Sequence, residues 1–425
     1  MRAIPLDVLA LLLLVPAYEG EDVAFFLLVV PLLFYVLLAL WHPLTPYETL
    51  PEKFGKVRLV FLARFVLLLV MTTSAALLPT MTNIFGRMAA DPDNVNVYAT
   101  MHDGAVQMEY GLDYLAAGKN PYIERYDNTP LQYYHFSGLE IPTNPAFDHF
   151  VYLPGFLLIS FPIYKLFDWL DLFYDQRWIY LAAYVLIILL LPLLADAPKN
   201  KLLLVAAVGL NPLITGPVII GMNDIMVFLA LLLMVLLLRN KRFLLAAVFM
   251  GAACTLKQSA WFVVPFYFLL MWEMLSAENR LRDLMKIAGI IGLLMVAVVG
   301  SLALWNLPAF IQDVLAYPSG NVPVNYPIRG YTLGVLLVGA GLISSPLDSF
   351  PFWIFQLLLG LPLMVLLFRY QWKQNELGTM LLCASIFIFG MGFASRFFQS
   401  NYVGFVIGLM TLGFILAQKE FVIDN

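Results

Sequence analysis

Residues 59–80 read LVFLARFVLLLVMTTSAALLPT, a run of 22 residues in which Arg64 is the one charged side chain. About 20 apolar residues in a helix are enough to cross the hydrocarbon core of a bilayer. The whole chain shares this character: 62% of its 425 residues are hydrophobic, 12% are charged, and mean hydropathy is +0.85. Soluble domains average about 45–50% apolar and about 25% charged residues. We therefore predict an all-α polytopic membrane protein.

Apolar runs of this kind recur along the chain, and we expect twelve of them to cross the membrane. Two further apolar stretches, 151–167 and 331–343, are predicted to be interfacial or re-entrant helices of the outer leaflet. A crossing by 151–167 would move all later basic loops to the opposite side. The twelve predicted spans lie near residues 5–18, 24–41, 59–80, 178–194, 202–220, 225–238, 243–256, 260–275, 287–304, 350–368, 379–394 and 402–417.

Lysine and arginine in the short loops predict the orientation. One set of loops carries fourteen basic residues, whereas the opposite short loops carry three, Lys257, Arg329 and Arg396. Because basic loops stay on the cytoplasmic side, the first set is predicted to be cytoplasmic, together with both termini.

The predicted spans divide the chain into three segments. Residues 1–58 form an N-terminal hairpin and cytoplasmic loop, 59–304 a catalytic module with an outer loop at 82–177, and 305–425 a C-terminal module with an outer loop at 305–349. Residues 82–150 hold nine acidic and three basic side chains, although the net charge of the whole chain is only -4. We expect the function to reside in this acidic region, and the net charge gives no reason to expect a nucleic-acid partner.

A helix is predicted to start at His102-Asp103-Gly104 and to end before Gly118 and Pro121. Asp103, Gln107, Tyr110 and Tyr114 share one face of it at positions i, i+4, i+7 and i+11. A carboxylate, an amide and tyrosines are suited to a sugar, whose hydroxyls need acceptors and whose ring has apolar faces. A plain N-cap is an equally good interpretation of Asp103.

These residues, with motifs farther along, resemble the bacterial GT-C glycosyltransferases, most closely the mannosyltransferase-like branch. The resemblance covers roughly residues 59–417, and the hairpin at 5–41 and a long insert at 123–150 depart from it. The motifs that carry it are His102-Asp103-Gly104…Glu109…Leu115…Gly118-Lys119-Asn120-Pro121-Tyr122, Val151-Tyr152-Leu153-Pro154, Asn211-Pro212…Gly221-Met222-Asn223-Asp224, Gly251…Lys257…Pro265, Pro327-Ile328-Arg329-Gly330 and Gln399-Ser400-Asn401-Tyr402.

The resemblance implies a GT-C-like fold in a bacterial-type cytoplasmic (inner) membrane and a polyprenyl-phosphate sugar as donor. A hydroxyl of a glycan, glycolipid or protein would be the acceptor, and the anomeric centre would be inverted. Asp103 matches the aspartate that acts as general base, and partial desolvation near the membrane is expected to raise its pKa.

The leaving phosphate needs cations, and Lys257, Arg329 and Arg396 are the candidates at the outer ends of spans. The alternative is that they snorkel into lipid headgroups. His102 could assist Asp103, bind phosphate or be a plain loop histidine. The predicted substrate-binding residues are His102, Gln107, Glu109, Tyr110, Asn223, Asp224, Lys257, Arg329, Arg396 and Asn401.

Asp224 begins a predicted span, where it is either a helix N-cap or an acceptor-binding residue. Asp103, Glu109 and Asp224 are also the set of carboxylates that could hold Mg²⁺ or Mn²⁺. A monophosphate carrier near cationic side chains does not require a metal, so we predict no metal and no other cofactor.

Two alternative functions remain open. A transporter or flippase for lipid-linked or small polar substrates would place ionisable groups near the middle of its spans and often shows repeats. An O-antigen ligase or polymerase would use outer arginines in place of Asp103.

Overall fold

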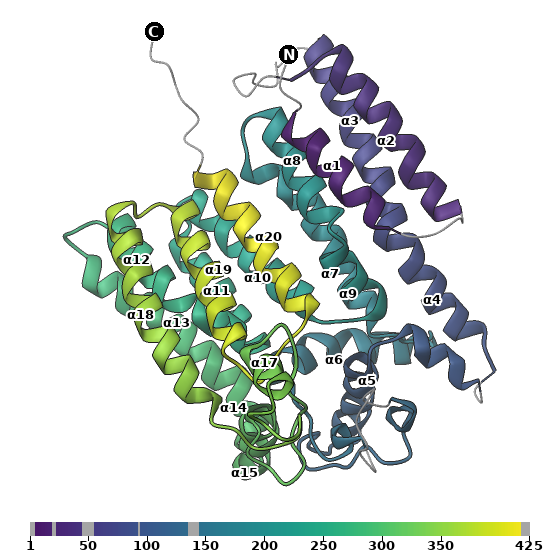
Figure 1. Ribbon diagram of the computed structural model, residues 1–425, viewed down its shortest axis with the longest axis vertical. Coiled ribbons are helices and arrows are strands. Elements are labelled where there is room, and N and C mark those ends of the chain that lie inside the picture. The colour runs from purple at the N-terminus through teal and green to yellow at the C-terminus, as the bar shows by residue number, and fades with distance from the viewer. Residues whose placement is uncertain (1–4, 19–22, 45–54, 92–93, 135–143, 418–425) are drawn as a thin grey trace.

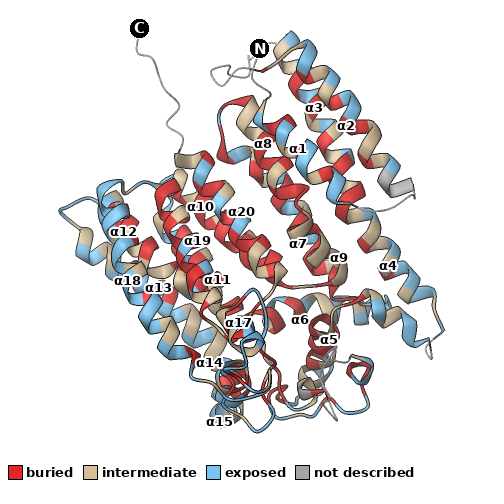
Figure 2. Cartoon of the chain, in the orientation of Figure 1, coloured by how far each residue is buried: buried red, intermediate tan, exposed pale blue. Residues whose placement is uncertain are grey.

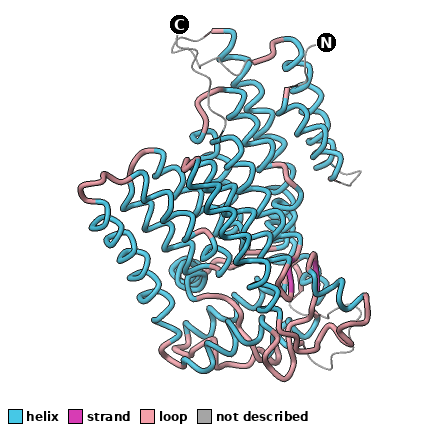
Figure 3. The backbone as a smooth tube through the Cα atoms, turned by 60° about the vertical axis from the view of Figure 1, so that its left-hand side comes forward, coloured by secondary structure: helices cyan, strands magenta, loops and turns pink. Residues whose placement is uncertain are grey.

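The computed structural model describes residues 5–18, 23–44, 55–91, 94–134 and 144–417. The chain is 76% helical, and the described residues contain one pair of parallel two-residue strands, β1 Arg329–Gly330 and β2 Phe397–Phe398. The helices form one elongated bundle, and most of the loops and both strands gather at one end of it (Figures 1 and 3). The predicted all-α membrane fold is confirmed at this level.

Three helical rods form the N-terminal part. α1 (Leu6–Leu14) ends in a 3-10 turn at Val15–Ala17, α2 (Val23–Trp41) follows, and α3 (Lys56–Thr72) runs through a π-helical turn into α4 (Leu78–Ala89). Together Lys56–Ala89 make a helix of 34 residues. The helix continues past residue 82, where the outer loop is predicted to begin, because the apolar run ends near Thr80 but Asp91-Pro92 is the first strong helix stop.

The outer region between α4 and α7 contains two longer helices. α5 (Asp103–Ala116) is the helix predicted from the sequence, and Gly118 after it has a φ of +72°. α6 (Pro154–Trp169) lies crosswise at the end of the bundle in the view of Figure 1. The remaining turns of this region are 3-10 helices at Val95–Thr100, Pro130–Tyr133 and Pro145–Phe147.

The centre of the bundle is built from α7 (Arg177–Leu190, with a 3-10 turn at Leu191–Leu194), α8 (Pro198–Gly209), α9 (Pro212–Ile220), α10 (Asp224–Arg239) and α11 (Phe243–Leu256). The run predicted as a single span at 202–220 is bent by 49° between α8 and α9. The bend falls at Asn211-Pro212, because proline lacks the N–H that would continue the helix. Tyr184 donates its hydroxyl to the carbonyl of Gly209 at 2.6 Å, which satisfies one carbonyl that the break frees.

The C-terminal part supplies the other face of the bundle. Figure 2 colours much of α2, α13 and α18 as exposed, and only 11% of the most apolar window of Arg280–Ala303 and 17% of that of Phe352–Lys373 are buried. Exposed apolar faces of this size are typical of a protein surrounded by lipid.

The elements of the C-terminal part are a 3-10 turn at Gln258–Phe262, α12 (Val264–Met274), α13 (Arg280–Leu294), a π turn at Met295–Val299, α14 (Gly300–Ala303), α15 (Leu307–Ile311), a π turn at Gln312–Ala316, α16 (Tyr317–Ser319), α17 (Leu333–Gly339), α18 (Phe352–Lys373), α19 (Leu377–Phe393) and α20 (Ser400–Ala417).

Among the described residues, five helices are long and apolar enough to cross a membrane, or six if the bent α8–α9 pair counts as one span. Each of the twelve predicted spans contains helix, but several of these helices are short, so the count of twelve stays a prediction.

Loops predicted to share a side of the membrane do lie together. Arg239, at the end of α10, donates to the carbonyl of Leu194 and pairs with Asp196 at 2.5 Å. Arg239 belongs to the basic loops predicted to be cytoplasmic, and Asp196 lies in another of these loops, between the predicted spans 178–194 and 202–220. α1 begins and α20 ends at this same end of the bundle (Figure 1). Residues 1–4 and 418–425, together with Lys53 and Lys419 of the basic loops, lie outside the described residues.

Candidate active site

A cavity of about 740 Å³ lies at the loop-rich end of the bundle. Its wall combines the start of α5, the start of α6, the α9–α10 and α11–α12 connections, the start of α18 and the α19–α20 connection. Of the predicted site residues, eight line it: His102, Asp103, Gln107, Asn223, Asp224, Lys257, Arg396 and Asn401.

Asp103 is the first residue of α5, and its carboxylate is held by its neighbours. The backbone N–H of Gly104 donates to its Oδ1 at 2.7 Å, and Nδ1 of His102 lies 2.9 Å from the same oxygen. The N-cap is His102 and not Asp103, so the interpretation of Asp103 as a plain N-cap is wrong. The hydroxyl of Tyr152 packs directly against Gly104, since a Cβ added at Gly104 would lie 1.8 Å from it.

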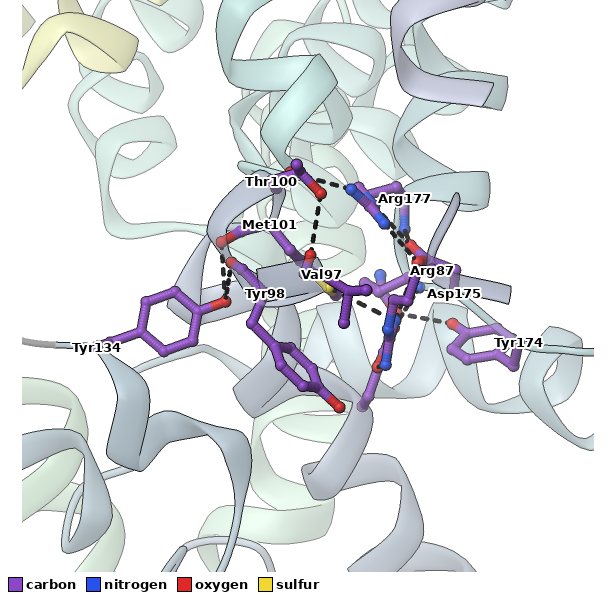
Figure 4. A network of polar contacts seen from close by, with 11 residues as sticks. Arg87, Val97, Tyr98, Thr100, Met101, Tyr134, Tyr174, Asp175 and Arg177 are labelled. Carbon is purple, nitrogen blue, oxygen red and sulfur yellow. Dashed lines mark hydrogen bonds and ion pairs between the residues drawn. The ribbon is translucent and has the colours of Figure 1, made fainter. Parts of the chain in front are cut away.

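The backbone before Asp103 is fixed at several points. The N–H of His102 donates to the carbonyl of Ile220 at 2.6 Å. From the other side, the hydroxyl of Tyr134 donates to the carbonyls of Tyr98 and Met101 at 2.9 and 2.8 Å (Figure 4). The position of Asp103 is therefore set by packing and hydrogen bonds and does not depend on a free loop.

The pKa of Asp103 is lower than usual, which corrects the expectation of a raised value. Burial alone raises the pKa, as expected, but the His102 ring, the Gly104 N–H and the charge of Arg329 together outweigh it. All three favour the ionised carboxylate. Asp103 is thus a carboxylate at neutral pH.

Four predicted residues from three distant segments meet in a second polar group, which we call the lysine cluster: Asn223, Asp224, Lys257 and Asn401. Nζ of Lys257 lies 2.6 Å from Oδ1 of Asp224 and 3.3 Å from Oδ1 of Asn223. Asn401 donates to the other carboxylate oxygen of Asp224 at 2.6 Å. The ammonium also lies 4.3 Å from the centre of the Tyr402 ring, within cation–π range.

The lysine cluster corrects two alternative interpretations. Asp224 does not cap α10, since it is the first helical residue and both of its oxygens are bound by side chains. Lys257 does not snorkel, since its side chain is 14% exposed and points at Asp224.

Gln107 and two outer-loop residues, His149 and Asp313, hold the outer loops together. Nε2 of Gln107 donates to the carbonyls of Ala146 and His149, both at 2.8 Å. The ring of His149 lies 2.8 Å from the carboxylate of Asp313, which also accepts from the N–H of Phe150. These contacts join the described parts of the two predicted outer loops to each other.

The other predicted residues have different surroundings. Among the described residues, Glu109, Tyr110 and Arg329 are not part of the cavity wall. Glu109 is bound by both terminal nitrogens of Arg87, at 2.7 and 2.9 Å. Arg329 is exposed in β1, close enough to lower the pKa of Asp103.

Arg396 lines the cavity but is only 2% exposed. Its guanidinium donates to the carbonyls of Tyr326, Pro346 and Asp348. These bonds fasten the loop at 305–349 to the α19–α20 connection and support a structural role for Arg396 in place of phosphate binding.

The sequence model of glycosyltransferase family 87, a family of GT-C-type membrane glycosyltransferases, matches residues 150–393. The match covers more than half of the chain. The chain belongs to glycosyltransferase family 87. Searches of curated proteins and of solved structures give no match. The matched segment of this family 87 protein holds Asn223, Asp224 and Lys257, whereas Asp103 and Asn401 lie outside it.

The family 87 cavity has a polar and an apolar part. The polar part is formed by Asp103, His102 and the lysine cluster. The apolar part lies at α18, α19 and the connections before them, where Trp353 lines the cavity and is 60% exposed on the outside of the bundle. Phe350, Phe352, Trp353, Ile388 and Met391 line this part, and other apolar residues, among them Leu153, Phe156 and Leu256, line the cavity from the segments that carry its polar residues.

The carboxylates proposed for a metal are not assembled as a trio, because Glu109 is paired with Arg87. No group of three or more histidine, cysteine, aspartate or glutamate side chains in the described part of the chain could hold a metal ion. That the enzyme uses no metal stays a prediction.

Sequence reasoning missed the charged residues behind Asp103, namely Arg87, Asp175 and Arg177. Asp175 and Arg177 are both 0% exposed. A signal was present: Asp175-Gln176-Arg177 stands directly before an apolar span, where charges are costly unless they are paired or used.

Proposed function

We propose that this family 87 enzyme transfers a sugar from a polyprenyl-phosphate donor to a hydroxyl of a glycan, glycolipid or protein acceptor on the extracytoplasmic side. Asp103 acts as general base and the anomeric centre is inverted. The observation that carries the proposal is the cavity itself, in which a fixed carboxylate, an ammonium cluster and an apolar wall face one volume.

The reaction needs one proton acceptor. The carboxylate of Asp103 takes the proton of the acceptor hydroxyl while that oxygen forms a bond to the anomeric carbon. The bond from the anomeric carbon to the phosphate oxygen breaks, and polyprenyl phosphate leaves with the electron pair. A single displacement of this kind inverts the centre, and general-base assistance contributes about 10²–10⁴-fold.

The leaving phosphate is assigned to Lys257 and Arg329. Lys257 is pre-oriented by Asn223 and Asp224 in the cavity wall. Arg329 is exposed, and its positive charge lowers the pKa of Asp103. A phosphate bound near Asp103 would therefore also be attracted by Arg329. A cation at the site where phosphate charge grows stabilises the transition state more than the ground state.

The prenyl chain is assigned to the apolar part of the cavity. Trp353 belongs both to the cavity wall and to the exposed face of α18, so a chain could pass there from the bilayer into the site. The proposal includes twelve crossings, as the apolar runs predict, cytoplasmic termini, as the basic loops predict, and the bacterial-type inner membrane that the resemblance implies. It includes no metal or other cofactor.

Family membership favours a transferase over a transporter. The three carbonyls bound by Arg396 also argue against a ligase or polymerase that relies on this arginine.

The test uses purified full-length protein with polyprenyl-phosphate mannose or glucose and a panel of glycan and glycolipid acceptors. Asp103→Asn should lower kcat by about 10²–10⁴-fold, as expected for the loss of a general base. Asp113→Asn is the matched control, because Asp113 lies on the same helix, accepts from Tyr164 and does not line the cavity. Full activity of a folded Asp103→Asn protein would contradict the role of Asp103.

A further inference from the structure

Behind Asp103 lies a network of four charged side chains, Arg87, Glu109, Asp175 and Arg177 (Figure 4 labels three of them). Arg177 donates from Nε and Nη2 to the two carboxylate oxygens of Asp175, at 2.9 and 2.8 Å. Arg87 bridges Asp175 at 2.9 Å and Glu109 at 2.7 Å. The network therefore joins the end of α4, the middle of α5 and the start of α7.

Arg177 also reaches the segment that leads into Asp103. Its Nη1 donates to the carbonyl of Thr100 at 3.0 Å. Tyr134 holds the carbonyls on either side of it, those of Tyr98 and Met101, as Figure 4 shows. Arg177 thus binds a carbonyl in the middle of the segment that Tyr134 holds at Tyr98 and Met101.

The stem of Arg177 contacts the other half of the site. A Cβ added at Gly221 would lie 2.9 Å from Cγ of Arg177 and 3.0 Å from Cβ of Ala105. Gly221 has a φ of +90° and is followed after one residue by Asn223 and Asp224. One side chain therefore contacts both the Asp103 segment and the segment that holds the lysine cluster.

We propose that Arg177 is a positioning residue, which sets the spacing between the carboxylate of Asp103 and the lysine cluster. The inference rests on the proposed function, in which these two groups serve the base and the phosphate. Buried ion pairs are weak contributors to stability, because desolvation offsets most of the attraction. Geometry is a better reason for placing the buried Glu109, Asp175 and Arg177 and the partly buried Arg87 here, since a displacement of about 1 Å at a reacting group costs about 10²-fold in rate.

The first test is Arg177→Lys, which keeps the positive charge beside Asp175. A single ammonium cannot pair with both carboxylate oxygens and also reach the carbonyl of Thr100. We expect kcat to fall by about 10–100-fold, with KM for the donor and the acid limb of the pH profile unchanged. Arg125→Lys is the matched control, because Arg125 is exposed in the same outer region and pairs only with Asp127 and Asp148 among the described residues.

Titration with polyprenyl phosphate separates positioning from loss of folded protein. An unchanged number of binding sites and unchanged affinity, together with the lower kcat, support the proposal. A number of sites that falls in step with kcat overturns it, as does an Arg177→Lys protein with wild-type kcat.

Gly221→Ala is the second variant, for use if Arg177→Lys does not fold. It leaves all four charges in place but pushes against the stem of Arg177 and Cβ of Ala105, at a φ of +90° where alanine is itself strained, and a loss of kcat at unchanged donor affinity is expected. Wild-type kcat in this variant overturns the proposal. The Asp103→Asn measurement keeps the two proposals apart: an inactive Asp103→Asn with a fully active Arg177→Lys rejects the positioning role alone, whereas an active Asp103→Asn rejects the base.

Discussion

At the scale of single residues, the ionisation of Asp103 is decided by a competition. Burial opposes the charged form, whereas the neighbouring imidazole, the Gly104 N–H and Arg329 favour it and prevail. The lowered pKa keeps Asp103 ionised at neutral pH, but it also makes the carboxylate a weaker base than one whose pKa lies near the working pH.

The first prediction concerns the pH dependence of kcat/KM. Because the pKa of Asp103 is lowered from its ordinary 3.8, activity should be limited by this group only below that pH. Replacing His102 with alanine removes a partner of the ionised form, so the pKa should rise and the acid limb should move to higher pH. The same replacement at His42, whose imidazole lies outside the cavity wall, should not move it. An acid limb that stays in place in His102→Ala would show that His102 does not tune the base.

The second prediction concerns the pair formed by Lys257 and Asp224, which are 14% and 8% exposed. Lys257→Met leaves the carboxylate of Asp224 buried without a cation, which costs on the order of 3 kcal/mol of unfolding free energy. Lys257→Met combined with Asp224→Asn should recover part of this loss. Thermal unfolding in detergent measures both proteins. If the double variant is as unstable as the sum of the two single variants, the two side chains do not interact.

The sequence selected residues that line one cavity, but it did not predict their partners. Asp224 and Lys257 were selected from their positions at span ends, and Asp103 and Asn401 from the motifs that carry the family resemblance. That Lys257 meets Asp224 and Asn401 could not be predicted, because the three come from separate connections. Arg396 was assigned to phosphate from its position at the outer end of a span. Its three partners are backbone carbonyls, and no side-chain pattern in the sequence indicates such partners.

At the scale of elements, the bend between α8 and α9 shows how a broken span is supported. The carbonyl of Leu210, whose helical partner Ile214 donates to Asn211 instead, accepts from the hydroxyl of Tyr18 at 3.2 Å. The same hydroxyl lies 2.6 Å from Oγ1 of Thr215. Tyr18 follows α1, so the N-terminal hairpin completes the hydrogen bonding of a helix that leads into the site. Composition predicted a span at 202–220, but the side chains that make the bend possible lie far away in sequence.

The third prediction follows from this contact. Tyr18→Phe keeps the ring but removes the hydroxyl, so the carbonyl of Leu210 loses a partner in a region without bulk water. We expect a loss of about 1–3 kcal/mol of unfolding free energy. Tyr370→Phe, at a tyrosine that is 53% exposed, is the control and should have little effect. Equal melting temperatures for the two variants would show that the contact does not support the break.

At the scale of the whole molecule, the arrangement of loops carries more information than the number of spans. Two sets of loops lie at opposite ends of the bundle: the lysine cluster at one end, and Arg239 with Asp196 at the other. The basic residues predicted both the separation and its direction. The structure shows the separation, since α10 begins at Asp224 and ends at Arg239.

The last prediction tests that direction. Cysteine introduced at Asp127 in the outer loop should react with a membrane-impermeant maleimide on intact cells, whereas cysteine at Asp196 should react only after the membrane is opened. The background should be low, because the two native cysteines, Cys254 and Cys383, are buried. Both positions are well exposed, with the side chains of Asp127 and Asp196 at 44% and 67%, so a lack of reaction reports the membrane and not the fold. The reverse labelling pattern would contradict the predicted orientation and place Asp103 on the cytoplasmic side. Labelling of both positions from one side would contradict the separation of the two ends.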